Sequence, residues 1–222
     1  QGVDIALPAV EINDYPRFSY RGAHLDVSRH FFPVDSVKRF IDMLALHNMN
    51  RFHWHLTDDQ GWRIEIKKYP KLTTVGGYRK KTIVGYMWDN PTEWDTKRYG
   101  GFYTQEDIKE VVAYAKKRFV EIIPEIEMPG HSVAALTAYP EYSCTGGPFE
   151  VEGRWGVFND IYCTKESTFT FMQDILGEVV ELFPSSYIHL GGDEAPRIRW
   201  KNCVHCQERM KQEHLTKEAE LQ

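Results

Sequence analysis

The chain has 222 residues, of which 42% are hydrophobic and 27% charged, so it can bury one substantial core and differs in composition from disordered chains. Its formal net charge of −5 at pH 7 provides no basic surface for a nucleic acid or an anionic membrane. No apolar run is long enough to span a bilayer, and the aromatic content of 14% favours a sugar as partner, because the C–H faces of sugars pack on aromatic rings.

The pattern of apolar residues predicts four repeats of a strand followed by a helix. Residues 1–16 contain two prolines and no periodic pattern, so we expect a connector from an upstream region. The predicted strands cover residues 18–27, 50–56, 119–126 and 186–190. The predicted helices run from Pro33 to about Met49, from a capping-box sequence at 104–107, from Met172 to Phe183, and through the charged tail from about Asn202.

Strands that alternate with helices indicate parallel strands joined by helical crossovers. Polar residues follow each predicted strand, and this end of the strands carries the active site in a (βα)8 barrel. A doubly wound sheet would also bind its ligand there. We predict an α/β fold of the (βα)8 TIM-barrel type, with only about four βα units in this chain. Two unusually long loops, at 63–103 and before Met172, indicate either site-building insertions or further elements that the apolar pattern does not reveal.

The fourth predicted strand leads into Gly191 and Gly192, and then into Asp193 and Glu194. In a regular strand these two carboxylates would point to opposite faces, so both can serve one pocket only if the chain leaves strand geometry at the glycines. Like charges at close range raise the pKa of one carboxyl group, which leaves an acid beside a charged partner. The alternative is that the pair caps the next helix, where carboxylates are also favoured.

The cysteines are Cys144, Cys163, Cys203 and Cys206, and only the last two have a spacing typical of metal sites. Without a second close pair, the sequence favours reduced thiols or a local disulfide over a structural zinc site. We therefore expect no metal and no cofactor.

Four stretches of the chain resemble, in the same order, the sequence motifs of glycoside hydrolase family 20, the β-N-acetylhexosaminidases. They are RGAHLDVSRH at 21–30, HWHLTDDQGWR at 53–63, PEIEMPGH at 124–131 and HLGGDE at 189–194. That family folds as a (βα)8 barrel, so the resemblance implies that residues 17–222 form the N-terminal half of the catalytic barrel. The other half carries aromatic walls and a tyrosine of the sugar pocket. We expect the isolated segment to have little activity, and its uncovered strand edges to favour self-association.

The resemblance implies an exo-acting enzyme that releases terminal non-reducing β-linked N-acetylglucosamine or N-acetylgalactosamine. The mechanism would retain configuration and use the substrate's own acetamido oxygen as nucleophile. Glu194 would be the general acid and then the base, and Asp193 would orient the acetamido group. His131 and Asp58 would complete a proton relay with Glu194.

Arg29 would bind ring hydroxyl groups in this reading, and the alternative is a structural ion pair with Asp26. Glu127 departs from the aspartate that the family more often carries, and its extra methylene should alter how Asp193 is held. Asp59 is expected only to frame the pocket. The expected partner is a glycan or amino-sugar oligosaccharide, and the longer protein is expected to be secreted or periplasmic.

Two other functions stay open on the sequence alone. His53 and His55 face the same side of their strand and, with Asp58, Asp59 and His131, would suit a metal-dependent barrel hydrolase. A non-catalytic sugar-binding protein would keep the aromatic residues but would not need both acids of the Asp-Glu pair.

Overall fold

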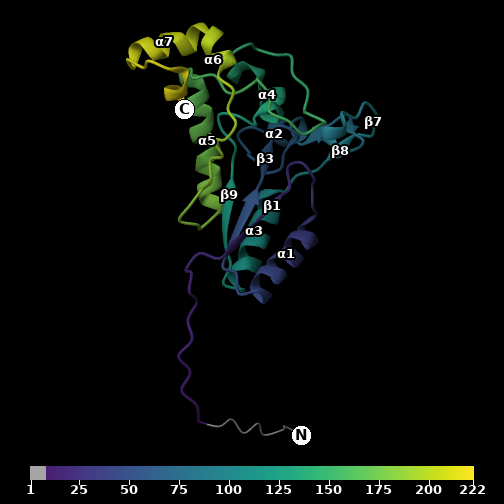
Figure 1. Ribbon diagram of the computed structural model, residues 1–222, viewed down its shortest axis with the longest axis vertical. Helices are drawn as coiled ribbons and strands as arrows, with labels where there is room; N and C mark the ends of the chain where they lie inside the picture. The colour runs from purple at the N-terminus through teal and green to yellow at the C-terminus, as the bar shows by residue number, and fades with distance from the viewer. Residues whose placement is uncertain (1–8) are drawn as a thin grey trace.

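The computed structural model describes residues 9–222, and its centre is a sheet of three parallel strands (Figure 1). The strands are β1 (Gly22–Asp26), β2 (Arg51–His55) and β9 (Glu121–Glu125), hydrogen-bonded in the order β1-β2-β9. Each lies within a strand that the sequence predicts. Helices occur in the connections between them, so the prediction of an α/β fold with parallel strands is confirmed.

The fourth predicted strand, at 186–190, is reduced to a single bridge between His189 and Glu125 of β9. The amide of His189 donates to Pro124 O at 2.9 Å, but the amide of Ser186 donates to the carboxylate of Glu121 instead of to a strand carbonyl. After Leu190 the glycines turn the chain away. The prediction of a full strand is therefore wrong. At the start of the segment the Glu121 side chain replaces a backbone hydrogen-bond partner, and at its end the turn at the glycines ends the pairing with β9.

Three helices cover one face of the sheet and close the core. They are α1 (Val34–Leu46), α3 (Gln105–Lys116) and α5 (Glu166–Leu182). Each helix buries an apolar stripe at helical spacing: Val37, Ile41 and Leu44 in α1, Ile108, Val111 and Ala115 in α3, and Phe171, Ile175 and Val179 in α5. Helix α3 begins with the predicted capping box, formed by Thr104 and Asp107.

Strand β2 divides its side chains between the core and the opposite face of the sheet. Phe52 and Trp54 are fully buried in the core with the helices. His53 and His55 point to the other face, as the two-residue period of a strand requires. The register places His55 beside Glu125 of β9. The sheet thus has one apolar face under the helices and one face rich in histidines and acids.

The long connections contain short elements. Between β2 and α3 these are β3 (Thr57–Asp58), β4 (Gly61–Trp62), α2 (Lys71–Thr74), β5 (Tyr78–Arg79), β6 (Thr82–Ile83), η1 (Met87–Asp89), β7 (Trp94–Asp95) and β8 (Tyr99–Gly100). After β9 they are α4 (Val133–Ala138) and η2 (Pro140–Tyr142), and near the C-terminus α6 (Ile198–Asn202), α7 (Val204–Gln212) and η3 (Glu218–Leu221). The short strands pair antiparallel as β3-β4, β5-β8 and β6-β7.

Residues 9–16 of the predicted connector form no helix or strand, and residues 1–8 lie outside the described residues. Within the described part of the chain, no helix is both long and apolar enough to cross a membrane. The four cysteines are free, which agrees with the reduced thiols that the sequence favours and not with its other alternative, a local disulfide. Instead of pairing with each other, Cys203 and Cys206 at the start of α7 face the loop that carries Cys144 and Cys163.

Arg63 fixes the first long connection to the loop after β1. Its side chain is fully buried, and its guanidinium group donates to the carbonyl oxygens of Val27, Ser28, Gly77 and Gly101. Backbone carbonyl groups need a partner when they are buried, and here one side chain serves four of them. The loop that carries Arg29 is therefore held in place through its backbone.

Replacing Arg63 with methionine keeps much of the side-chain volume and leaves these carbonyl oxygens without donors. We expect Arg63→Met to lower the free energy of unfolding by at least about 3 kcal/mol. The control Arg39→Met, on the exposed side of α1, should change it by less than about 0.5 kcal/mol. Urea denaturation measures both values, and equal effects of the two substitutions would contradict the role of Arg63.

Candidate active site

The five residues predicted for the site come from four loops at the carboxyl ends of the strands. Arg29 follows β1, Asp58 follows β2, His131 follows β9, and Asp193 and Glu194 follow the bridge at the fourth segment. Because parallel strands have their carboxyl ends at one edge of the sheet, these loops meet. Each of the five residues lies within 3.6 Å of at least one other.

The two glycines turn the chain so that both acids face His131. Gly191 and Gly192 have φ angles of +65° and +91°, in the region that favours glycine. The Nε2 atom of His131 lies 3.6 Å from Asp193 Oδ2 and 3.5 Å from Glu194 Oε2. The acid side chains are 62% and 49% exposed, so a substrate can reach them. Neighbouring carboxylates thus share one side of the sheet, because the chain leaves strand geometry before them.

His131 is held from behind by two buried aspartates. Its Nδ1 atom lies 3.0 Å from Asp59 Oδ2 and 3.2 Å from Asp58 Oδ1. Burial alone would lower the pKa of His131, but hydrogen bonds and charges from Asp58 and Asp59 outweigh burial and raise the pKa to about 11. The imidazole ring is therefore a cation at neutral pH. Its Nε2 atom is buried, forms no hydrogen bond with the described residues, and faces the Asp-Glu pair.

Arg29 is engaged with the buried carboxylate of the site. Its NH2 atom lies 2.7 Å from Asp58 Oδ2, and its NH1 atom donates to Asp26 Oδ2 at 3.0 Å. The ion pair with Asp26 that the sequence offers as an alternative is thus present, together with a second one. Burial would raise the pKa of Asp58, but hydrogen bonds from His131 and His55 and the charge of Arg29 hold that pKa well below its usual range.

Glu127 lies beneath the glycine turn. It is buried, and its Oε1 atom lies 3.6 Å from His55 Nε2. A Cβ atom added at Gly191 would lie 1.7 Å from Glu127 Oε2, so only glycine fits above this carboxyl group. Burial, followed by the negative charges of Glu125 and Asp193, raises the pKa of Glu127. The residue that departs from the family pattern therefore packs directly against the turn that carries Asp193.

A group of histidines surrounds Glu125 deeper on the same face of the sheet. His53 Nε2 and His189 Nδ1 lie 2.7 Å and 2.8 Å from its carboxylate oxygens, and His55 Nδ1 lies 3.4 Å away. Burial would raise the pKa of Glu125, but the hydrogen bond from His53 and the charges of the histidines lower it. His53 is therefore engaged by Glu125 instead of Asp58, which separates it from the ligand set of the metal-hydrolase alternative.

His24, His55 and Glu125, and likewise His53, Glu125 and His189, have spacing that could hold a metal ion, and so do two groups around the predicted site. The latter two are His55, Asp58 and Glu127, and Asp58, Asp59 and His131. Both include Asp58, which already has the guanidinium of Arg29 at 2.7 Å. A metal ion at Asp58 would be repelled by that charge and by the His131 cation. The two groups that include Asp58 therefore suit proton transfer better than metal binding.

The sequence prediction omits Glu125 and gives Asp59 only a framing role. In the structure, Asp59 is the nearer carboxylate to His131, and its Oδ1 atom also accepts from the amide of Val133 at 2.9 Å. Both contributions had a signal in the sequence. Asp59 adjoins Asp58, and Glu125 precedes Glu127 by two positions, which places both on the same face of an extended segment.

The pKa of His131 can be tested by titration. Its value in the folded protein, about 11, exceeds the ordinary value of 6.5, so the proton on His131 stabilises the fold fully below pH 6.5, and this stabilisation is lost as the pH rises through 11. We expect the His131 imidazole signals in NMR to stay those of the cation from pH 6 to pH 9. Asp59→Asn should bring its pKa closer to the ordinary value. Titration of His131 near pH 6.5 in the unmodified protein would contradict the electrostatic account.

Comparison with known proteins identifies the family. A family model described as "Glycosyl hydrolase family 20, catalytic domain" matches residues 18–222 of the chain. The chain is 52% identical over 219 residues to a protein named Beta-hexosaminidase from Porphyromonas gingivalis, and this alignment covers 98% of the chain and 27% of the relative. It is also similar to the crystal structure of a beta-N-acetylhexosaminidase, with a TM-score of 0.85 and 38% identity over 92% of this chain and 42% of that chain.

A GH20 exo beta-N-acetylglucosaminidase from Vibrio harveyi, solved in complex with N-acetylglucosamine, has a TM-score of 0.79 and 39% identity over 94% of this chain and 32% of that one. The chain thus spans between 27% and 42% of the length of these proteins. The family match covers nearly all of the described residues, so the chain belongs to glycosyl hydrolase family 20.

Proposed function

We propose that the protein containing this chain is an exo-acting β-N-acetylhexosaminidase that releases terminal non-reducing β-linked N-acetylglucosamine or N-acetylgalactosamine from glycans. The observation that carries the proposal is the position of Asp193 and Glu194, whose carboxylates both lie within 3.6 Å of His131 Nε2 and are open to solvent. The names of the relatives support it, as does the N-acetylglucosamine bound to the Vibrio harveyi enzyme. Enzymes that digest extracellular glycans act in secreted or periplasmic form, and we infer the same here.

We infer that residues 17–222 form the N-terminal half of a (βα)8 barrel and that residues 1–16 connect it to an upstream region. The parallel order of β1, β2 and β9, followed by the bridge at His189, supports this inference. A further support is the limited share of each relative that the chain covers. Closure of the barrel would pair the free edges of β1 and of the fourth segment. The histidine-rich face would then line the barrel interior.

The isolated chain would therefore have little activity. The site is open on the side where a second half would stand, and Asp193 and Glu194 are the most exposed of its acids. A substrate bound there would lack walls on that side, and the unpaired strand edges would favour self-association of the chain.

In the proposed reaction, the acetamido carbonyl oxygen of the substrate attacks the anomeric carbon while Glu194 gives its proton to the departing glycosidic oxygen. The glycosidic bond breaks as the new carbon–oxygen bond forms, and the product is an oxazolinium-type ring. Glu194, now a carboxylate, then takes a proton from a water molecule that opens this ring at the anomeric carbon. Two inversions at one carbon retain the β configuration.

Asp193 would accept the N–H of the acetamido group, which fixes the carbonyl oxygen for attack and stabilises the positive charge of the ring. His131 would stabilise the carboxylate of Glu194 after the proton has left, because its cationic ring faces that carboxylate. Asp58 and Asp59 would act indirectly, through His131, because they keep its ring charged and oriented.

Arg29 would bind hydroxyl groups of the terminal sugar. Its side chain is 27% exposed, and its contacts with Asp26 and Asp58 fix the plane of the guanidinium group. A fixed guanidinium fork can donate to two neighbouring oxygen atoms with little loss of entropy. The two functions suggested for Arg29, an ion pair and a sugar contact, are therefore compatible.

In the longer protein, Glu194→Gln tests the role of the general acid, because it removes the proton donor and keeps its size. We expect kcat/KM to fall about 10²- to 10⁴-fold on a substrate whose leaving group is a sugar, and much less on a dinitrophenyl glycoside, whose leaving group needs no proton. The control Glu181→Gln, exposed on α5, should change neither rate. Undiminished release of the sugar leaving group by Glu194→Gln would contradict the assignment.

The acetamido nucleophile can be tested with a matched pair of substrates. The longer protein should hydrolyse an aryl 2-acetamido-2-deoxy-β-glucoside and act at least about 10⁵-fold more slowly on the aryl β-glucoside with a 2-hydroxyl group, because the second substrate lacks the internal nucleophile. Initial rates with both substrates at equal concentration measure the ratio. Similar rates would exclude substrate-assisted catalysis.

A further inference from the structure

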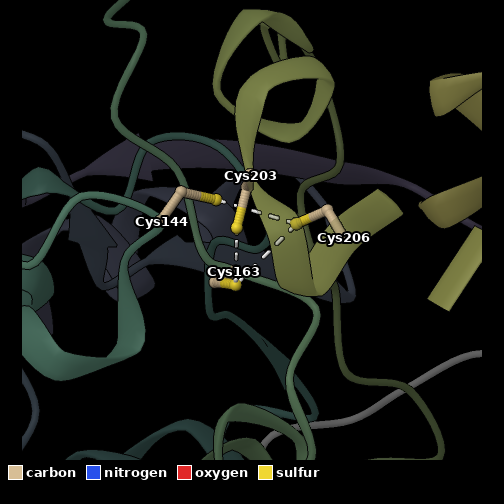
Figure 2. A group of neighbouring side chains, drawn as sticks. All are labelled: Cys144, Cys163, Cys203 and Cys206. Atoms are coloured by element: carbon tan, nitrogen blue, oxygen red, sulfur yellow. Dashed lines mark hydrogen bonds between the residues drawn. The ribbon is translucent and has the colours of Figure 1, made fainter. Parts of the chain in front are cut away.

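All four cysteines of the chain meet at one point beside the active-site loops (Figure 2). The Cys144 and Cys206 sulfurs are 3.7 Å apart, the Cys163 and Cys203 sulfurs 3.6 Å, and the Cys163 and Cys206 sulfurs 3.8 Å. Figure 2 shows the four side chains pointing toward one another from a loop on one side and from the start of α7 on the other. Along the chain, Cys144 and Cys163 precede Cys203 and Cys206 by 40 residues or more.

These distances fit a tetrahedral metal site and do not fit disulfides. A disulfide needs a sulfur–sulfur distance of about 2.05 Å. Four thiolates bound to zinc at about 2.3 Å occupy the corners of a tetrahedron whose edges are about 3.8 Å. The three measured distances agree with these edges, and each cysteine takes part in at least one of them.

Local backbone structure delivers the ligands in two pairs. An antiparallel bridge between Ser143 and Tyr162 joins the two segments in which Cys144 and Cys163 are the next residues. The bridge holds these two segments together although 18 residues separate the two cysteines along the chain. Cys203 precedes the first residue of α7 and Cys206 lies in its first turn, where free N–H groups stabilise thiolates.

The surroundings are those of a closed structural site. Cys163, Cys203 and Cys206 are 1%, 6% and 0% exposed, and Cys144 is partly buried. The cysteines form a small core of their own with Ile161 and Trp200, separate from the main core. A site with four protein ligands and no open position holds a zinc ion for stability and not for catalysis.

We propose that Cys144, Cys163, Cys203 and Cys206 bind one zinc ion as thiolates. The ion would tie the loop after α4 to the helices that follow the Asp-Glu pair. Direct hydrogen bonds continue from there to the active site: Trp200 Nε1 donates to Tyr162 O at 2.7 Å, and the amide of Tyr162 donates to Pro129 O at 3.0 Å, two residues before His131. The zinc ion would thus fix the position of the loop after α4 relative to the helices that follow Asp193 and Glu194.

Metal analysis of the longer protein tests the proposal. The protein is purified in reductant without added metal, and any histidine tag is removed. We expect elemental mass spectrometry to find about one zinc ion per chain. The four cysteine thiols should react with a thiol reagent only as zinc is released. Absence of stoichiometric metal, stoichiometric iron in place of zinc, or a protein mass lowered by four hydrogens from two disulfides would each overturn it.

Three variants locate the ligands. Cys144→Ser and Cys203→Ser should each reduce the zinc content to about a tenth or less. His205→Ser changes the exposed histidine between the last two cysteines and should keep the zinc, because the imidazole is exposed beside Glu208 and is not part of the cysteine group. Retention of zinc by both cysteine variants, or its loss only in His205→Ser, would place the ion elsewhere and overturn the proposal. The metal content of the unmodified protein decides the question even if a cysteine variant does not fold.

Discussion

The buried carboxylate of Asp58 is the feature on which the site depends. An ionised carboxylate without solvent is costly unless charges and hydrogen bonds surround it. Here Arg29 lies at 2.7 Å, His55 at 3.1 Å and His131 at 3.2 Å. Arg29 and His131 come from the loops after β1 and β9, His55 is the last residue of β2, and Asp58 itself lies in the connection after β2. Neutralising one charge therefore fixes three loops relative to one another. The same contacts keep His131 cationic, which sets the electrostatics around Asp193 and Glu194.

The second constraint is the alternation of side chains along the strands. Phe52 and Trp54 bury their rings under the helices, so His53 and His55 must point to the opposite face. On that face Glu125 accepts from His53 and has a lowered pKa, whereas burial raises the pKa of Glu127. Two acids that lie close together on one face of the sheet thus have pKa values shifted in opposite directions. Their different partners, and not their chemical type, decide which of them carries charge.

Most of the fold could be predicted from the sequence, because periodicity and glycine position are local signals, whereas the acids of the site are assigned from the resemblance to the family motifs. Three parallel strands, their helices and the turn at Gly191 follow from these local signals. The reduced fourth strand could not be predicted, because its amide at Ser186 is taken by a distant carboxylate. The nearness of Asp59 to His131 and the meeting of the four cysteines depend on how loops pack. Loop packing brings together residues that are far apart in the sequence, and their spacing does not indicate that they will be in contact.

The central claim is that Asp193 and Glu194 work on one sugar from the same side of the sheet, with His131 behind them. A crystal structure of the longer protein with N-acetylglucosamine bound tests it most directly. The account predicts the acetamido N–H within hydrogen-bond distance of Asp193, the anomeric oxygen next to Glu194, and ring hydroxyl groups at Arg29. A sugar bound away from these residues, or Asp193 and Glu194 on opposite sides of the sheet, would contradict it.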